Sequence, residues 1–83
     1  MKIQIKSNIA LSDNGFVFNP ASGDSFSVNP MGVEIIKHIK AEKSASEIVA
    51  LLSEQFDADA ITIEKDLYDF KQLLLRHQLA DKA

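Results

Sequence analysis

The sequence contains no cysteine, few glycines and no long apolar run. The lack of cysteine excludes disulfides, thiolate zinc sites and cysteine nucleophiles. The three glycines, at positions 15, 23 and 32, are too dispersed to form a phosphate-binding loop. No apolar run approaches the roughly 18 residues of a membrane-spanning helix, and the N-terminus lacks the apolar segment of a signal peptide. These absences favour a soluble cytoplasmic module with no cofactor and no membrane partner.

An excess of positive charge is also missing. The formal net charge is -3, and the three cations of the expected third helix are balanced by three carboxylates. Without a basic stripe, few counterions would be released from a nucleic acid, so duplex binding should be weak. We therefore predict no nucleic acid partner.

The composition is that of an ordinary small domain. The chain has 83 residues, of which 46% are hydrophobic and 25% are charged. It shows no internal repeat, low-complexity run or linker. We predict a single domain over residues 1–83, with flexible ends at residues 1–7 and 80–83.

The first third of the chain has the period of two that is typical of strands. Apolar residues alternate with polar ones in residues 3–5 and 9–11, and Asn14-Gly15 follows as a type I′ hairpin turn. Residues 16–18 would pair with residues 9–11. After a turn at residues 19–23, residues 25–28 would form a third strand that pairs back on the second.

From Pro30 the period changes to that of helices. Asn29 would cap a first helix, and Ser44 with Glu47 forms a capping box for a second. Asp59 would cap a third helix over about residues 60–78. The expected core residues of the three helices are Met31, Ile35, Ile36, Ile39, Ile48, Leu51, Leu52, Phe56, Ile63, Leu67, Phe70, Leu74 and His77. The order predicts an α+β, winged-helix-like fold, in which a three-stranded antiparallel sheet precedes three helices.

No group of side chains indicates catalysis. His38 and His77 lie on different expected helices, and no His-Glu-x-x-His metal motif is present. Caps and a solvated helix face explain most carboxylates, and no serine lies in a Gly-x-Ser-x-Gly elbow. We predict no catalytic residue, no metal site and no enzyme activity. His77 is expected to close the buried stripe of the third helix.

The third strand has an undefended edge. Ser25, Phe26, Ser27 and Val28 include neither lysine nor proline, whereas the first strand carries Lys2 and Lys6, which discourage pairing with another chain. This edge is predicted to accept a peptide strand. The alternatives are that a loop or helix covers the edge, or that the strand is too short to aggregate and needs no protection.

The third helix carries a second apolar stripe. At 100° per residue, Ile61, Tyr68 and Leu75 lie about 120 to 160° from Ile63, well away from the core side. The stripe is predicted to wall a groove for a peptide. Packing on the first hairpin or on a dimer mate is the alternative, and single exposed apolar residues are also common.

An edge alone binds weakly. About four backbone hydrogen bonds give roughly 2 to 6 kcal/mol, short of the roughly 8 kcal/mol of a micromolar complex. Side-chain contacts beside the edge would supply the rest. The predicted peptide-binding residues are therefore Ser25, Phe26, Ser27, Val28, Ile61, Lys65, Tyr68, Gln72 and Leu75.

The order and spacing of these elements resemble the PqqD-like family over about residues 9–79. The matching pieces are the hairpin strands, the glycine turn before residues 25–30, the helix start at residues 46–48, and residues 56–59 followed by Asp66, Leu67 and Phe70. Ala60 and Met31-Gly32 depart from the family pattern at helix starts.

The resemblance implies a recognition element that binds the leader segment of a ribosomally made precursor peptide as an added strand. It implies delivery of that peptide to a modifying enzyme, often a radical S-adenosylmethionine protein, in cofactor or natural product biosynthesis. A winged-helix transcription regulator and a plain oligomerisation module, including a homodimer through the strand edge, are the alternative interpretations.

Overall fold

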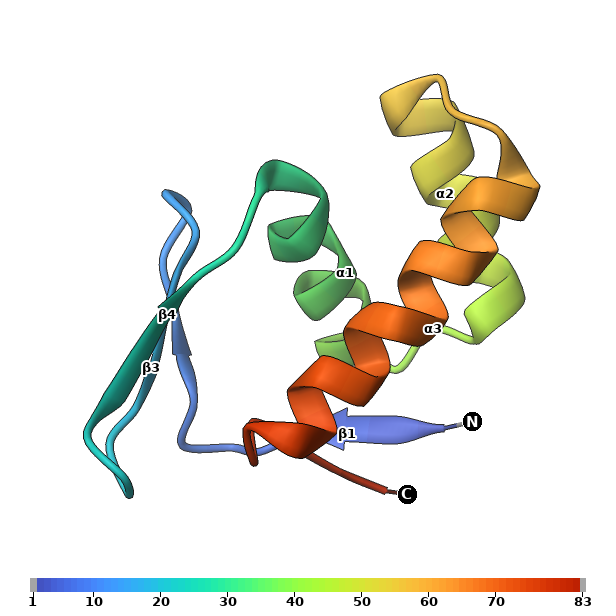
Figure 1. Ribbon diagram of the computed structural model, residues 1–83. Coiled ribbons are helices and arrows are strands. Elements are labelled where there is room, and N and C mark those ends of the chain that lie inside the picture. Colours follow the sequence, from blue (N-terminus) through green and yellow to red (C-terminus); the bar gives the residue numbers. More distant parts are fainter. Residues whose placement is uncertain (1, 83) are drawn as a thin grey trace.

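The computed structural model describes residues 2–82, as two small sheets and three helices (Figure 1). In chain order the elements are β1 (Ile3–Ile5), β2 (Ala10–Leu11), β3 (Phe16–Asn19), β4 (Asp24–Ser27), α1 (Pro30–Lys40), α2 (Ala45–Phe56), α3 (Ala60–Arg76) and β5 (Ala80–Lys82). The predicted α+β class, with a three-stranded antiparallel sheet before three helices, is confirmed.

The three-stranded sheet has the order β2-β3-β4. Phe16 pairs with Ser27 and Phe18 pairs with Ser25, so the third strand does fold back on the second. The type I′ turn is wrong, because Gly15 has a positive φ of 91° and Asn14 does not. The amide of Gly15 donates to the Ser12 carbonyl at 3.1 Å, which makes a four-residue turn that ends in a left-handed glycine.

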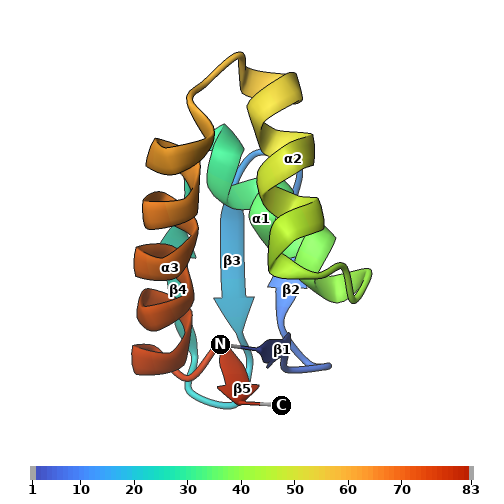
Figure 2. The same cartoon turned by 90° about the vertical axis from the view of Figure 1, so that its right-hand side faces the viewer.

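A second sheet joins the two ends of the chain, which corrects two expectations. β1 pairs with β5, with Ile3 opposite Lys82 and Ile5 opposite Ala80 (Figure 2). Residues 3–5 and 80–82 are therefore strands rather than flexible ends, and the strand beside Lys2 and Lys6 is not an outer strand of the three-stranded sheet. Ile3 and Ala80 are buried, so apolar burial holds this pair in place. Residues 1 and 83 lie outside the described part.

The three helices begin where the caps predict. The Asn29 Oδ1 atom accepts from the Gly32 amide at 2.8 Å, and the Ser44–Glu47 capping box is complete. Asp59 caps α3 through the Thr62 amide. α3 ends at Arg76 rather than at Gln78, so His77 is its C-cap.

The core lies between the helices and one face of the three-stranded sheet, whose other face is open (Figure 1). Two expected core residues are wrong, because Leu51 and His77 are exposed. The buried apolar residues are Ile3, Ile9, Val17, Val33, Ile35, Ile36, Ile39, Ile48, Leu52, Ile63, Leu67, Leu74, Leu79 and Ala80. Within residues 2–82, no helix has the length and apolar character needed to cross a membrane.

Candidate functional site

β4 is an outer strand of its sheet. It pairs with β3 on one side, and no strand of residues 2–82 pairs with its other side. The predicted open edge is therefore present. The defence expected of such an edge, a lysine, a proline or a bulge, is missing from Asp24–Ser27.

Alternation along the ladder identifies which backbone groups face outward. The Val28 amide donates to the Gly15 carbonyl at 2.8 Å, so Val28 directs its backbone groups toward the hairpin. In an antiparallel pair this direction alternates residue by residue. Phe26 therefore also faces β3, and the N–H and C=O groups of Ser25 and Ser27 point to the open edge. An added strand would find four hydrogen-bonding groups there.

Two contacts place α3 and its C-cap His77 near β4 and Val28, the residue that follows β4. The rings of Phe26 and His77 lie 4.8 Å apart, with a 51° angle between their planes. Further along, the backbone of Gly32 in α1 lies close to both Val28 and Phe70, since a Cβ at Gly32 would lie 2.9 Å from Val28 Cβ and 3.2 Å from Phe70 Cζ. The side of α3 that carries Phe70 and His77 is thus the side that faces β4.

Leu73 belongs to this side of α3 and was not among the predicted site residues. At 100° per residue it lies about 60° around the axis from Phe70 and about 40° from His77. Its side chain is 38% exposed. The sequence shows Leu73 as an apolar residue beside the core stripe of the helix. It does not show that β4 lies on that side of the helix, so Leu73 could not be assigned to the site. Phe70 and His77 were assigned to the core rather than to the site.

The second stripe of α3 does not adjoin β4. Ile61, Lys65, Tyr68, Gln72 and Leu75 all lie about 140 to 180° around the helix axis from Phe70. The prediction that this stripe forms a wall beside the third strand is therefore wrong in geometry. Of the nine predicted peptide-binding residues, the structure keeps together the four of the strand and separates them from the five of the helix.

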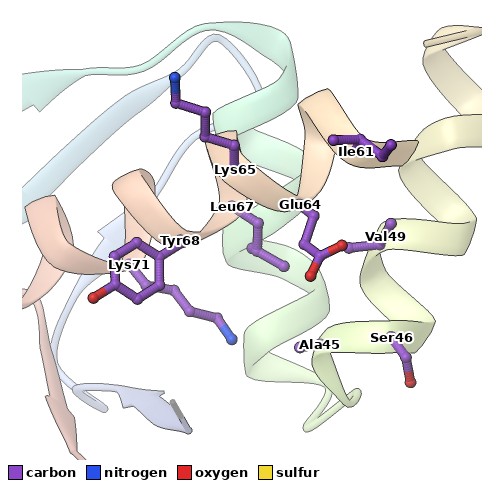
Figure 3. Close-up of a pocket in the computed structure, with 9 residues that line it drawn as sticks. All are labelled: Ala45, Ser46, Val49, Ile61, Glu64, Lys65, Leu67, Tyr68 and Lys71. Atoms are coloured by element: carbon purple, nitrogen blue, oxygen red, sulfur yellow. The ribbon is translucent and has the colours of Figure 1, made fainter. Parts of the chain in front are cut away.

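Three of the five predicted α3 residues line a hollow between α2 and α3 (Figure 3). This hollow has a volume of about 810 Å³. Ile61, Lys65 and Tyr68 form part of its α3 wall, and Ala45 and Val49 are on the α2 wall. Lys71 also lines it, and burial lowers the pKa of the Lys71 amine. Among residues 2–82, no group of three or more histidine and carboxylate side chains is arranged to hold a metal ion.

Leu75 and Ile61 differ in burial, which yields a prediction. Leu75 is half-buried and packs against the core, whereas Ile61 is 77% exposed. Leu75→Glu should therefore lower the free energy of unfolding by about 1 to 3 kcal/mol, because it places a charge in apolar surroundings. Ile61→Glu, the matched control, should change it by less than about 0.5 kcal/mol. Urea denaturation measures both, and equal losses would contradict the difference in burial.

Comparisons with known proteins agree with this architecture. A family model described as coenzyme PQQ synthesis protein D (PqqD) matches residues 15–80. The solved structure "TbiB1 in Complex with the TbiA(beta) Leader Peptide" has a TM-score of 0.84 and 24% identity, with 96% of each chain covered. "Lasso peptide synthetase B1 complexed with the leader peptide" has a TM-score of 0.84 and 17% identity, and the match covers 98% of this chain and 99% of that one. No curated protein sequence matches the chain.

Proposed function

The chain belongs to the PqqD family, and from that premise we propose that it is a non-enzymatic peptide chaperone. It binds the leader segment of a ribosomally made precursor peptide as an added strand on β4 and presents it to a modifying enzyme. The observation that carries this proposal is the open edge at Ser25 and Ser27, which lies beside the side of α3 that carries Phe70 and Leu73. The two solved structures that share the fold are described as complexes with leader peptides, which supports the same type of ligand.

Side chains beside the edge supply the affinity that backbone bonds lack. Four hydrogen bonds at about 0.5 to 1.5 kcal/mol each leave a gap of roughly 2 to 6 kcal/mol to a micromolar complex. Burying one large apolar side chain contributes about 1.5 to 3 kcal/mol. One or two peptide side chains packed against Phe26, Leu73 and His77 would therefore close the gap. The proposed site comprises residues 25–28 with this side of α3, and it leaves out Ile61, Lys65 and Tyr68.

The second partner follows from the role of presenting a peptide. We propose a modifying enzyme, of the radical S-adenosylmethionine type or another, that acts on the core segment while the leader stays on β4. Because such a precursor is made on ribosomes, the complex would form in the cytoplasm. A nucleic acid partner has no place in this proposal.

Titration of the ¹⁵N-labelled protein with synthetic leader peptides tests the function. Amide shifts should be largest at residues 25–28 and should extend to Leu73 and His77. Shifts confined to β2 or α2, with residues 25–28 unchanged, would overturn the proposal. A duplex DNA of random sequence at low salt is the control for the transcription-regulator alternative, and it should cause no shifts. Sedimentation at several concentrations tests the homodimer through the strand edge.

A further inference from the structure

The open face of the three-stranded sheet carries two exposed aromatic rings. Phe16 is 60% exposed and Phe18 is 43% exposed, while Val17 and Asn19 of the same strand are buried. The alternation of β3 therefore directs two of the five phenylalanines of the chain to the side away from the helices. Polar residues are the usual occupants of a solvated sheet face, so this aromatic pair needs an explanation.

The neighbours of the two rings on this face are small. Phe16 is opposite Ser27 on β4, and Phe18 is opposite Ser25. On the other side, Phe18 is opposite Ala10 of β2. Both serines are exposed. No large side chain of β4 therefore stands between the phenylalanine rings and the open edge of the sheet.

A strand added to β4 would bring its own side chains to this place. Strands in a sheet are about 4.7 to 4.9 Å apart, so the added strand would lie about 10 Å from β3. Its residues opposite Ser25 and Ser27 would point to the open face, two positions apart in the peptide. Aromatic and long side chains reach beyond the residue directly opposite them. Such side chains would lean over the serines and contact the rings of Phe16 and Phe18.

We propose that Phe16 and Phe18 read the outward-facing side chains of the bound peptide. The ligand is then a strand-forming peptide with large apolar residues at two positions, i and i+2, on the face away from the helices. This inference rests on the proposed function and adds specificity to it. The occupant is the peptide because only Ser25 and Ser27 separate the two rings from the open edge of β4 on this face of the sheet. Within residues 2–82 no strand pairs with that edge.

Selection from a random twelve-residue peptide library, displayed on messenger RNA, tests the inference without knowledge of the natural precursor. The full chain is compared with the Phe16→Thr/Phe18→Thr double variant, because threonine, like phenylalanine, is favoured in strands. Peptides enriched on the wild-type chain should show large apolar residues at i and i+2. The double variant should lose this preference and should bind the best wild-type peptide about tenfold more weakly, as expected for the loss of two aromatic contacts.

Tyr68→Thr is the matched control, since this exposed aromatic residue lies in the hollow between α2 and α3. It should leave the preference unchanged. If the double variant has a much lower melting temperature than the wild-type chain, the single variants Phe16→Thr and Phe18→Thr replace it. Each should lose the preference for a large apolar residue at one of the two peptide positions.

The other outcomes distinguish the role of Phe16 and Phe18 from the proposed addition of a peptide strand to β4. Equal enrichment on the wild-type chain and the double variant would overturn the role of the two rings and leave strand addition intact. No enrichment on the wild-type chain would overturn the proposed function itself. A wild-type dimer in sedimentation that the double variant converts to a monomer would assign the rings to a contact between copies, and the inference would be wrong.

Discussion

Gly15→Ala is expected to lower the free energy of unfolding by about 2 to 4 kcal/mol, the largest loss at any glycine of the chain. Two effects add at this position. The φ angle of 91° is a conformation that L-residues with side chains rarely adopt. A Cβ at Gly15 would also collide with the carbonyl oxygen of Val28, so the chain at the end of β4 must shift.

Gly23→Ala is the matched control for this prediction. Gly23 also has a positive φ, of 78°, but a Cβ there meets no atom within 4 Å. Only backbone strain remains, and a loss of about 1 kcal/mol is expected. Urea denaturation of both variants measures the difference, which reports the contact with Val28. Losses of equal size would show that the turn and β4 do not touch as described.

A consequence for binding follows from the same contact. The Val28 amide donates to the Gly15 carbonyl, so Gly15 holds the residue that directly follows β4. Because the backbone shifts at this point, the Gly15→Ala variant should also bind the peptide more weakly than the wild-type chain. The Gly23→Ala variant should bind the peptide as the wild-type chain does. Binding is measured under conditions in which both variants remain folded.

Local chemistry explains which parts of the fold the sequence predicts well. Asn29, Ser44 and Asp59 each satisfy free amides at a helix start within three residues of themselves. Such contacts depend only on nearby residues. The position of β4 at the outside of the sheet could also be predicted, because β4 is the last strand of the hairpin series and a helix follows it directly.

Non-local pairing explains the main error in the fold. β1 and β5 are at opposite ends of the chain, yet Ile5 pairs with Ala80. The short apolar piece at Leu79 and Ala80 looks like the end of a helix when only its neighbours are considered. Its burial, and the bond from the Lys6 amide to the Leu79 carbonyl at 3.1 Å, depend on a partner about 75 residues away.

The predicted site was wrong in its helix residues because the sequence does not give the orientation of α3 about its own axis relative to α2 and β4. The helical wheel correctly places Ile61 and Tyr68 away from the core side of α3, but a wheel does not say which neighbour lies in which direction. In the structure α2 takes the direction of Tyr68, and β4 takes the direction of Phe70 and His77. The handedness of the packing between sheet and helices, which the sequence pattern does not contain, decides between the two.

Ser27→Pro should weaken peptide binding by about 30-fold or more while leaving the fold intact. The Ser27 amide points to the open edge, and proline is tolerated in an edge strand where its nitrogen faces solvent. The substitution removes one donor and places a ring where the added strand would approach. The loss of the bond, with an unpaired carbonyl left on the peptide, costs about 2 kcal/mol.

Two variants control for this prediction. Ser27→Ala keeps the amide and should bind within about twofold of the wild-type chain. Phe26→Pro removes an amide that faces β3, so it should destabilise the sheet itself. Isothermal titration with a peptide that binds the wild-type chain, together with thermal melts, separates these effects.

The combination of results decides the position of the peptide. A folded Ser27→Pro variant that binds like the wild-type chain would mean that the peptide does not add to this edge. A Ser27→Pro variant as unstable as Phe26→Pro would show that the alternation assigned to β4 is wrong. A stable Ser27→Pro variant with weak binding, beside a normal Ser27→Ala, is the result that strand addition requires, because the missing amide and the proline ring both oppose a strand at this edge, whereas alanine changes neither.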